Sequence, residues 1–520
     1  QTLESDGLEL EIKISPAVGD RDTLRAEQSV NLELRFSYTD SGDPLIGAYP
    51  AAWLDRLTDD GIKLDDSLCR KTVGKHLEGG LMSAAEVDFN EYLVLTLDTA
   101  DSVSVIDPRF SFGGSRLLTR IPLGAAGADW TLDPAGNWLF VTVPETGSVA
   151  AIETATWKIL TRFEVGANPR RVAVQPDGAR LWIGHDGNAR KGPGVTMIDA
   201  RGFRELRHFN TGSGPHDFAF SDDSRYAFVI NRGANTVTVI SVAGLKLTAP
   251  IETGRAPTSV AWSTRDGMAW VAHADGTLAV VDPERGEVDA ILDVAVGQES
   301  PALGRIVFAP GGRFAFVPVP GGDQVHIVDS ARREIVRSVT VGRKPVEIAF
   351  SDQLAYVTHL DSAMVYGISL TGLEDPQGET RAIEIPIGRG ATASDTRPFG
   401  AHGVVQAPGG RAMLFAHAED RAVYYYMEGM AAPAGSFTTS KMHARAVLVL
   451  DRSLGEREPG VYAATARLGR AGPHHLSVFL DSPRWTGCIP VAIKPNPDLE
   501  AERLAARPLI VELLPGEREI

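Results

Sequence analysis

Four histidines recur at one position of a repeated sequence pattern. The residues that end the second apolar run of each repeat are, in chain order, Leu97, Val143, His185, Asn231, His273, Val319, His359 and His417. Neutral imidazole is a ligand of copper, zinc and iron, so these side chains are candidates for a metal or haem site. A polar side chain at a strand end also bonds the turn that follows. We favour this second interpretation, because successive repeats hold the four positions far apart.

A second repeated position begins the first apolar run of each repeat. The residues there are Ala128, Arg170, His216, Thr258, Gly304, Val346 and His402. His216 and His402 belong to the fourth and eighth repeats, so a ring of eight units places them on opposite sides of its axis. Two facing histidines predict a metal or cofactor site, and the alternative is that each is only a polar lining residue.

Soft ligands gather near the end of the repeats. Met427 and Met430 follow a run of three tyrosines, and His443 lies shortly after them. Thioether and imidazole groups together bind Cu(I). Methionine and aromatic residues also fill gaps where two domains pack. A copper site and domain packing are therefore the two interpretations of this segment.

Short strands must position these side chains. A unit of about 40–45 residues recurs from about 86 to 430, most clearly in residues 171–185 and 217–231. Apolar residues alternate within each run, as in strands. Four antiparallel strands per unit form one blade of a β-propeller, because one small sheet cannot cover its own faces. Eight copies have second strands near Tyr92, Trp138, Leu181, Tyr226, Met268, Phe314, Leu354 and Met413.

The predicted fold is all-β, with an eight-bladed propeller over residues 73–432 and seven blades as the alternative. The eighth copy lacks an obvious fourth strand, and we expect the segment near 73–82 to close the ring. Residues 1–72 and 433–520 also read as strands, and together they reach the about seven strands of an immunoglobulin-like fold. We therefore predict one β-sandwich built from both chain ends.

Two cysteines, Cys69 and Cys488, lie one in each flank. Their separation excludes a zinc knuckle or a C-x-x-C redox motif. One long-range disulfide between them would join the flanks and would require an oxidising compartment such as the periplasm. The alternative is two unrelated buried thiols. The chain starts at Gln1 rather than Met, as after removal of a secretory signal, so we expect a periplasmic or secreted protein.

Composition narrows the choice of partners. Asp and Glu number 67 against 51 Lys and Arg, a net charge of -16, which disfavours a nucleic-acid partner. No apolar run approaches the about 20 residues of a membrane span. The cations Arg109, Arg170, Arg171, Arg190 and Lys191 are candidates for anion binding at a propeller mouth, and we favour solvated surface charge for them.

Three segments carry a family resemblance. Residues 104–107 (Ser-Val-Ile-Asp), 140–143 (Phe-Val-Thr-Val) and 356–359 (Tyr-Val-Thr-His) resemble the YVTN-type propeller repeat. The C-terminal flank, with Pro-Gly-Val-Tyr at 459–462 and Leu-Asp-Ser-Pro at 480–483, resembles small periplasmic sandwich domains of the FixH/YtkA kind. Both resemblances concern the fold, because propellers carry many unrelated activities.

The start of the fourth repeat resembles a haem-binding propeller. Residues 214–217 (Gly-Pro-His-Asp) are similar to the first-strand start that supplies the axial histidine of cytochrome cd-type nitrite reductases, which have eight blades. The resemblance implies an axial role for His216 and distal roles for His402 and His359. No C-x-x-C-H occurs, so covalent c-type haem and a cytochrome c domain are absent. The flanking sandwich does not belong to that family either, and an analogous copper site stays equally open.

Three functions are compatible with these observations. The first is a periplasmic propeller that binds a metal, a haem or a redox partner in electron-transfer metabolism. The second is a non-catalytic scaffold for protein–protein interaction. The third is a copper or haem oxidoreductase whose site lies in the propeller funnel. No G-x-S-x-G, H-E-x-x-H or P-loop motif is present, and no catalytic residue is predicted.

Overall fold

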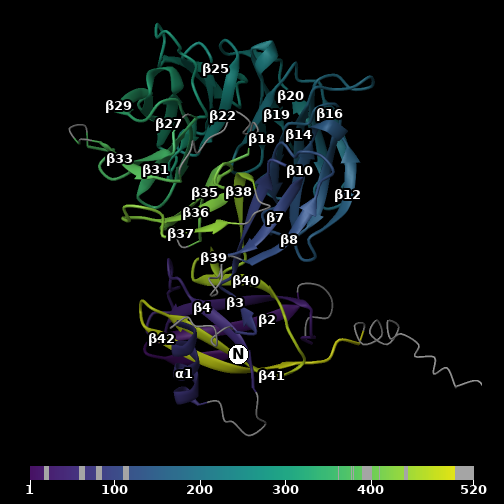
Figure 1. Cartoon of the computed structure of the whole chain (residues 1–520), viewed down its shortest axis with the longest axis vertical. Helices are drawn as coiled ribbons and strands as arrows, with labels where there is room; N and C mark the ends of the chain where they lie inside the picture. The colour runs from purple at the N-terminus through teal and green to yellow at the C-terminus, as the bar shows by residue number, and fades with distance from the viewer. Residues whose placement is uncertain are drawn as a thin grey trace, which may run out of the picture. The chain divides into compact units, whose positions relative to one another are not determined.

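The chain divides into two compact units, Gln1–Glu91 with Arg452–Ile520 (unit 1) and Tyr92–Asp451 (unit 2). The computed structural model (Figure 1) describes residues 1–16, 23–57, 65–77, 85–108, 116–360, 362–375, 378, 380–388, 401–408, 410–438 and 443–497. The described residues are almost entirely β-structure, as predicted, with three short 3-10 turns and the single α-helix α1 (Asp66–Leu77). No helix within these ranges has the length and hydropathy needed to cross a membrane.

Unit 2 consists of eight antiparallel sheets over its described residues, seven of them with four strands and one, sheet 4, with five. Sheet 1 contains β38 (Ala444–Asp451), β6 (Tyr92–Asp98), β7 (Ser102–Asp107) and β8 (Arg116–Pro122), and sheet 2 contains β9 (Trp130–Leu132), β10 (Trp138–Val143), β11 (Ser148–Glu153) and β12 (Lys158–Glu164). Sheet 3 contains β13 (Arg171–Val174), β14 (Arg180–His185), β15 (Gly194–Asp199) and β16 (Glu205–Phe209). Sheet 4 contains β17 (His216–Phe220), β18 (Tyr226–Asn231), β19 (Thr236–Ser241) and β20 (Lys246–Leu247), with β21 (Ile251–Glu252) also paired to β19.

Sheet 5 contains β22 (Pro257–Ser263), β23 (Met268–His273), β24 (Thr277–Asp282) and β25 (Glu287–Asp293), and sheet 6 contains β26 (Val307–Phe308), β27 (Phe314–Val319), β28 (Gln324–Asp329) and β29 (Glu334–Thr340). Sheet 7 contains β30 (Pro345–Phe350), β31 (Leu354–His359), β32 (Met364–Ser369) and β33 (Ala382–Pro386). Sheet 8 contains β34 (Val404–Gln406), β35 (Ala412–His417), β36 (Ala422–Met427) and β37 (Gly435–Thr438). In each sheet the first strand named lies at one edge, and we call it the inner strand.

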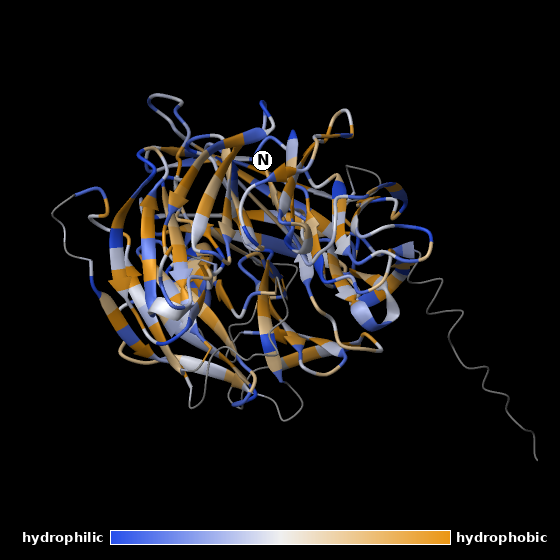
Figure 2. Cartoon of the chain, turned by 90° about the horizontal axis from the view of Figure 1, so that it is seen from above, coloured by the Kyte–Doolittle hydropathy of each residue, from blue (hydrophilic) through white to orange (hydrophobic). Residues whose placement is uncertain are grey.

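The sheets close into a ring because each one packs on the next. One apolar cluster joins sheets 1 and 2 through Leu97 and Val141, and equivalent clusters follow at each junction along the chain. A last cluster joins sheet 8 back to sheet 1 through Leu414 and Val94. Middle strands such as β10 are therefore buried on both faces, whereas the outer strand β12 alternates with solvent. Figure 2 shows the corresponding bands of apolar residues along the strands. This cyclic packing is that of a β-propeller.

The ring closes differently from the prediction. Strand β38 pairs with β6 and completes sheet 1, and β37 is the fourth strand of sheet 8. The prediction that 73–82 closes the ring is wrong, because 73–77 belong to α1 and 78–82 lie outside the described residues. Unit 2 thus runs from Tyr92 to Asp451 rather than over 73–432. The apolar pattern of β38 identifies a strand without identifying its partner.

Unit 1 contains two sheets assembled from both chain ends. Their strands are β1 (Thr2–Ser5), β2 (Leu8–Pro16), β3 (Ser29–Tyr38), β40 (Val461–Arg467) and β39 (Gly455–Glu458), and β42 (Trp485–Ile493), β41 (Gly472–Leu480), β4 (Ala51–Arg56) and β5 (Val87–Asp88). One apolar cluster lies between the sheets, including Phe36 and Leu34 from the first and Leu54 and Trp485 from the second. The rings of Phe36 and Trp485 meet edge-on at 5.8 Å. Strand pairing across the chain ends, β3 with β40 and β4 with β41, joins segments of both flanks in this unit.

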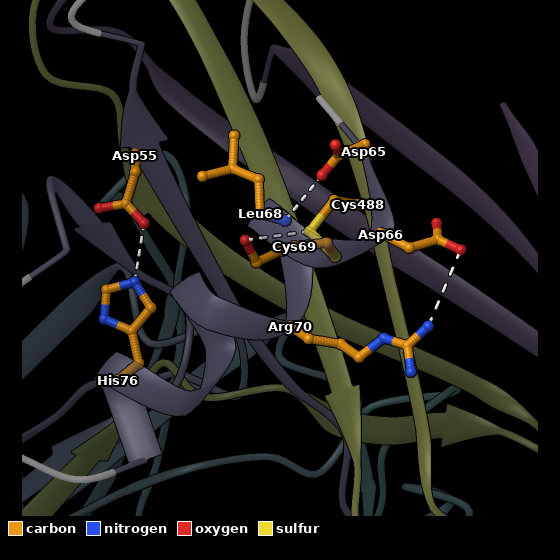
Figure 3. Close-up of a disulfide and its surroundings, with 9 residues drawn as sticks. Asp55, Asp65, Asp66, Leu68, Cys69, Arg70, His76 and Cys488 are labelled. Carbon is orange, nitrogen blue, oxygen red and sulfur yellow. Dashed lines mark hydrogen bonds and ion pairs between the residues drawn. A yellow bond between two sulfur atoms is a disulfide. The ribbon is translucent and has the colours of Figure 1, made fainter. Parts of the chain in front are cut away.

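The predicted disulfide is present in unit 1. Cys69 of α1 is bonded to Cys488 of β42, with their Cα atoms 5.8 Å apart (Figure 3). The helix begins where Asp65 Oδ1 accepts a hydrogen bond from Leu68 N at 2.8 Å, as an N-cap residue does. Near the other end of α1, His76 Nε2 lies 2.7 Å from Asp55 Oδ2 of β4. The helix is therefore fixed to its sheet by a covalent bond and one ion pair.

Candidate functional site at the inner strand ends

The strand-end histidines bond the hairpins that follow them. Gly187 N donates to His185 Nδ1 at 3.0 Å, and Nδ1 of His273 lies 3.1 Å from Thr277 O. His359 Nδ1 lies 3.0 Å from Met364 O in the same way. The hairpin interpretation is confirmed for these positions. The hairpin bond uses only Nδ1 of His359, and the distal role that the family resemblance implies for this residue stays a prediction.

Glycines explain why imidazoles fit at these positions. A Cβ atom on Gly166 would lie 2.2 Å from His185 Nδ1, and one on Gly254 would lie 2.8 Å from His273 Cγ. Gly388 and His417 show the same relation, with 2.9 Å to Cδ2. In each case the glycine ends the preceding sheet and covers the histidine ring of the next. The two repeated residue types therefore form one contact between neighbouring blades.

Buried strand-end imidazoles should make the protein sensitive to acid. Burial, and then the charges of His208, Lys191 and His216, lower the pKa of His185 to about 3, and burial lowers that of His359 to about 4. Both rings stay neutral in the folded chain, whereas they take up protons near pH 6.5 when it unfolds. We expect full stability above pH 7 and a loss of up to about 1.4 kcal/mol per pH unit for each histidine between pH 6.5 and 4.

Asn231 supplies the matched variants, because the fourth repeat carries asparagine at this position. His185→Asn and His359→Asn should each reduce the slope of unfolding free energy against pH, measured in urea from pH 7.5 to 4.5. A slope equal to that of the parent protein in both variants would contradict the expectation. A loss of unfolding free energy that is the same at all pH values would show only that the substitution disturbs packing.

His216 opens β17 and is 3% exposed. Its Nδ1 lies 3.1 Å from Asn231 Oδ1 and 3.3 Å from Ile230 O, so this nitrogen carries the proton and donates. Its Nε2 is buried and has no hydrogen-bond partner among the described residues. Burial lowers the pKa of the ring and outweighs the hydrogen bonds to the backbone of Ile230, to Asn231 and to the backbone of His185, so the imidazole is neutral. That is the state in which histidine binds a metal.

His402 occupies the same repeat position but a different environment. Its side chain is 40% exposed, and Nδ1 lies 2.8 Å from Glu347 Oε1 of the preceding sheet. Gly403 N also donates to that carboxylate, at 3.1 and 3.2 Å. Three sheets separate His216 from His402 in either direction around the ring, as the eight-unit pattern predicts.

The candidate ligands do not form a polydentate cluster. Over the described residues, no group of three or more His, Cys, Asp or Glu side chains is arranged to hold a metal ion. Met427 and Met430 are both exposed, and Met430 O accepts a hydrogen bond from Tyr426 at 2.8 Å. The backbone of His443 accepts one from Thr99, and residues 439–442 before it lie outside the described ranges. A copper site at these three residues stays a prediction.

Sequence reasoning missed the residues that follow the strand-start position. This inner position holds, from sheet 2 round to sheet 1, Asp129, Arg171, Asp217, Ser259, Arg305, Glu347, Gly403 and Ala446. The sequence contained one signal for these residues: side chains of opposite charge follow one another at spacings near the repeat length. The prediction of solvated surface charge is wrong for Arg171, and Arg109 lies outside the described residues.

Arg171 is buried between two carboxylates. Its Nη1 lies 2.8 Å from Asp129 Oδ2 and its Nε lies 2.7 Å from Asp217 Oδ1, with side-chain exposures of 11%, 0% and 2% respectively. Burial alone would lower the pKa of Arg171, but the two carboxylates outweigh it and raise that pKa. Burial would likewise raise the pKa of Asp217, but Arg171 and then Arg305, at 3.9 Å, lower it.

The inner position also ties neighbouring inner strands together. Val172 N donates to Asp129 Oδ2 at 2.9 Å, and Ile306 N donates to Ser259 Oγ at 3.0 Å. The Glu347–Gly403 bonds do the same between sheets 7 and 8. Inner strands of adjacent sheets do not pair with each other as β-strands. These hydrogen bonds to side chains connect the strands instead.

Comparison with known proteins gives a fold relationship. The chain matches no protein-family model and no curated protein sequence. It resembles apo AztD from Citrobacter koseri with a TM-score of 0.50 and 12% identity, covering 69% of this chain and 97% of that one. It also resembles the dihydro-heme d1 dehydrogenase NirN (0.48, 15%, covering 70% and 74%) and Kuenenia stuttgartiensis hydrazine synthase (0.43, 20%, covering 58% and 96%). At these identities, the likeness to AztD shows a shared fold and nothing of activity.

Proposed function

We propose that unit 2 is an eight-bladed propeller that binds a haem-type cofactor at its inner strand ends in the periplasm or another secreted setting. The proposal rests mainly on His216. Its Nε2 is buried and has no hydrogen-bond partner among the described residues. A buried polar atom of this kind calls for a partner that the chain does not supply. The Cys69–Cys488 disulfide supports an oxidising compartment.

The sparse donor set favours a haem over a bare ion. Zinc and copper sites in proteins draw three or four ligands from the chain, and the described residues contain no such group. A haem brings its own ring nitrogens and needs only one or two axial ligands from the protein. Bound there, it would supply redox or ligand-binding chemistry. The bonds of His216 Nδ1 to Asn231 and Ile230 would fix the orientation of the ring.

Access to His216 requires a local movement. A Cβ atom on Gly214 would lie 3.0 Å from Nε2 of His216, so this segment covers the edge of the ring. The backbone at 212–215 must therefore move before a ligand reaches the nitrogen. His402, held by Glu347 on the opposite side of the ring of sheets, is the second candidate ligand.

Titration with haemin tests this proposal. We expect a Soret band that shifts as the purified full chain binds haemin, with affinity at least about tenfold weaker in His216→Ala. His326→Ala is the matched control, since Nε2 of His326 is likewise buried without a hydrogen-bond partner among the described residues, but β28 is not an inner strand. Metal analysis for copper and zinc runs in parallel. A folded parent protein that takes up neither haemin nor metal contradicts the proposal and favours the interaction scaffold.

A further inference from the structure

One arginine at the inner strand ends has a side-chain nitrogen without a hydrogen-bond partner among the described residues. At the inner position, Asp129 and Asp217 are matched by Arg171 and Arg305, and Glu347 contacts His402. Sheets 8 and 1 contribute Gly403 and Ala446 there, and neither has a charged side chain. The strand-start residue of sheet 1 is Arg445, the eighth member of the series that contains His216 and His402.

Arg445 is placed by an irregularity in its strand. The register of β38 against β6 shifts between Ala444 and Ala446, so Arg445 is the extra, unpaired residue of a bulge. Bulges commonly re-aim a side chain next to a functional site. Here the guanidinium reaches the next sheet, where Nη2 donates to Gly127 O.

The guanidinium of Arg445 is incompletely satisfied. Its Nε is buried with no hydrogen-bond partner, and over the described residues no carboxylate lies within ion-pair distance of it. Burial lowers the pKa of Arg445, and Asp98 only partly opposes this. Asp98 is itself occupied by the hydroxyls of Thr96, Ser102 and Ser104, at 2.7 to 3.0 Å. A partly buried charge in this condition weakens the fold until an opposite charge arrives.

We propose that Arg445 binds the oxyanion group, a carboxylate or a phosphate, of a small molecule at the inner ends of sheets 1 and 2, where its guanidinium reaches Gly127 O. The planar fork of a guanidinium matches both groups in a bidentate manner. This site is independent of the haem proposal, because it requires neither His216 nor a metal.

Calorimetric titration of the full chain with inorganic phosphate and, separately, with succinate tests the site. We expect the parent protein to bind at least one probe, and Arg445→Met to bind it roughly 10- to 100-fold more weakly. Arg170→Met is the matched control, because Arg170 occupies the same repeat position with its Nε donating to Asn168 Oδ1 at 2.9 Å. The stronger probe identifies the group as phosphate or carboxylate.

Thermal unfolding separates binding from a structural role. In low-salt buffer without either probe, Arg445→Met should melt at or above the temperature of the parent protein, because an uncompensated charge has been removed. Addition of the bound probe should raise the melting temperature of the parent and not that of the variant. If Arg445→Met does not fold, Arg445→Lys keeps the charge and should bind more weakly. No binding by the parent protein, or equal binding by the Arg445 variants, overturns the proposal.

Discussion

Arg171→Met is expected to destabilise unit 2 by about 3–5 kcal/mol. The substitution keeps the volume of the side chain but leaves Asp129 and Asp217, both almost fully buried, without their shared cation. Removing one partner of a buried ion pair is far more costly than never having built the pair. The loss should appear as a lower denaturant midpoint for the propeller transition, followed by near-ultraviolet circular dichroism.

Arg285→Met is the control for this first prediction. Arg285 also bridges carboxylates, Asp282 and Asp289, but its side chain is half exposed in the turn before the outer strand β25. Exposed ion pairs contribute about 0–1 kcal/mol, so this variant should unfold nearly as the parent does. Combining Arg171→Met with Asp129→Asn and Asp217→Asn should recover part of the loss, because the buried charges are then gone. Equal effects of Arg171→Met and Arg285→Met would refute the argument.

Removing the disulfide with Cys69→Ser and Cys488→Ser together is expected to cost about 2–4 kcal/mol of unit 1 stability. Of the residues of α1, only Cys69 and Val73 are buried, so apolar packing holds the helix weakly. The His76–Asp55 contact remains, as does the stacking of His76 on Trp53, with ring centroids 5.1 Å apart. We therefore expect proteolysis within α1 to accelerate strongly, measured by the cleavage rate under native conditions.

Two comparisons isolate the bond itself. Reduction of the parent protein with a thiol should reproduce the behaviour of the double variant, and the propeller transition should stay unchanged in both. Arg70→Ala, an exposed helix substitution, should leave the cleavage rate as it is in the parent. An α1 that resists protease equally with and without the bond would mean that packing alone secures the helix.

The repeat pattern predicted most of the fold because it reports local periodicity. Alternating apolar runs identified the middle strands of all eight sheets, and the glycine and histidine positions proved to be one repeated contact. The pairing of β38 with β6 was not predictable in the same way, since a strand of Val and Leu fits any partner. Register across several hundred residues depends on three-dimensional packing that no local window contains.

The candidate site shows the same limit on a smaller scale. His216 and His402 occupy equivalent positions, yet one is buried and the other is 40% exposed. The difference comes from the preceding sheet: a Cβ atom on Gly184 would lie 2.9 Å from His216 Cβ, whereas Glu347 reaches out to His402. The burial of Arg171 likewise depends on acids one repeat away on each side. Sequence identifies such residues as candidates, and only their neighbours decide their chemistry.

The strand order also determines the order in which the sheets can be completed during synthesis of the chain. Sheet 1 has an open edge until Ala444–Asp451 has been synthesised, although its other three strands come from the start of the ring. Strands β3 and β4 of unit 1 lack their partners β40 and β41 for longer still, because both partners come after all of unit 2 in the sequence. In the sequence, unit 2 is thus inserted between the two segments of unit 1, so the sheets of unit 1 can be completed only after unit 2 has been synthesised. A nascent chain exposes unpaired strand edges throughout its elongation, and it needs protection from aggregation until its last strands are available.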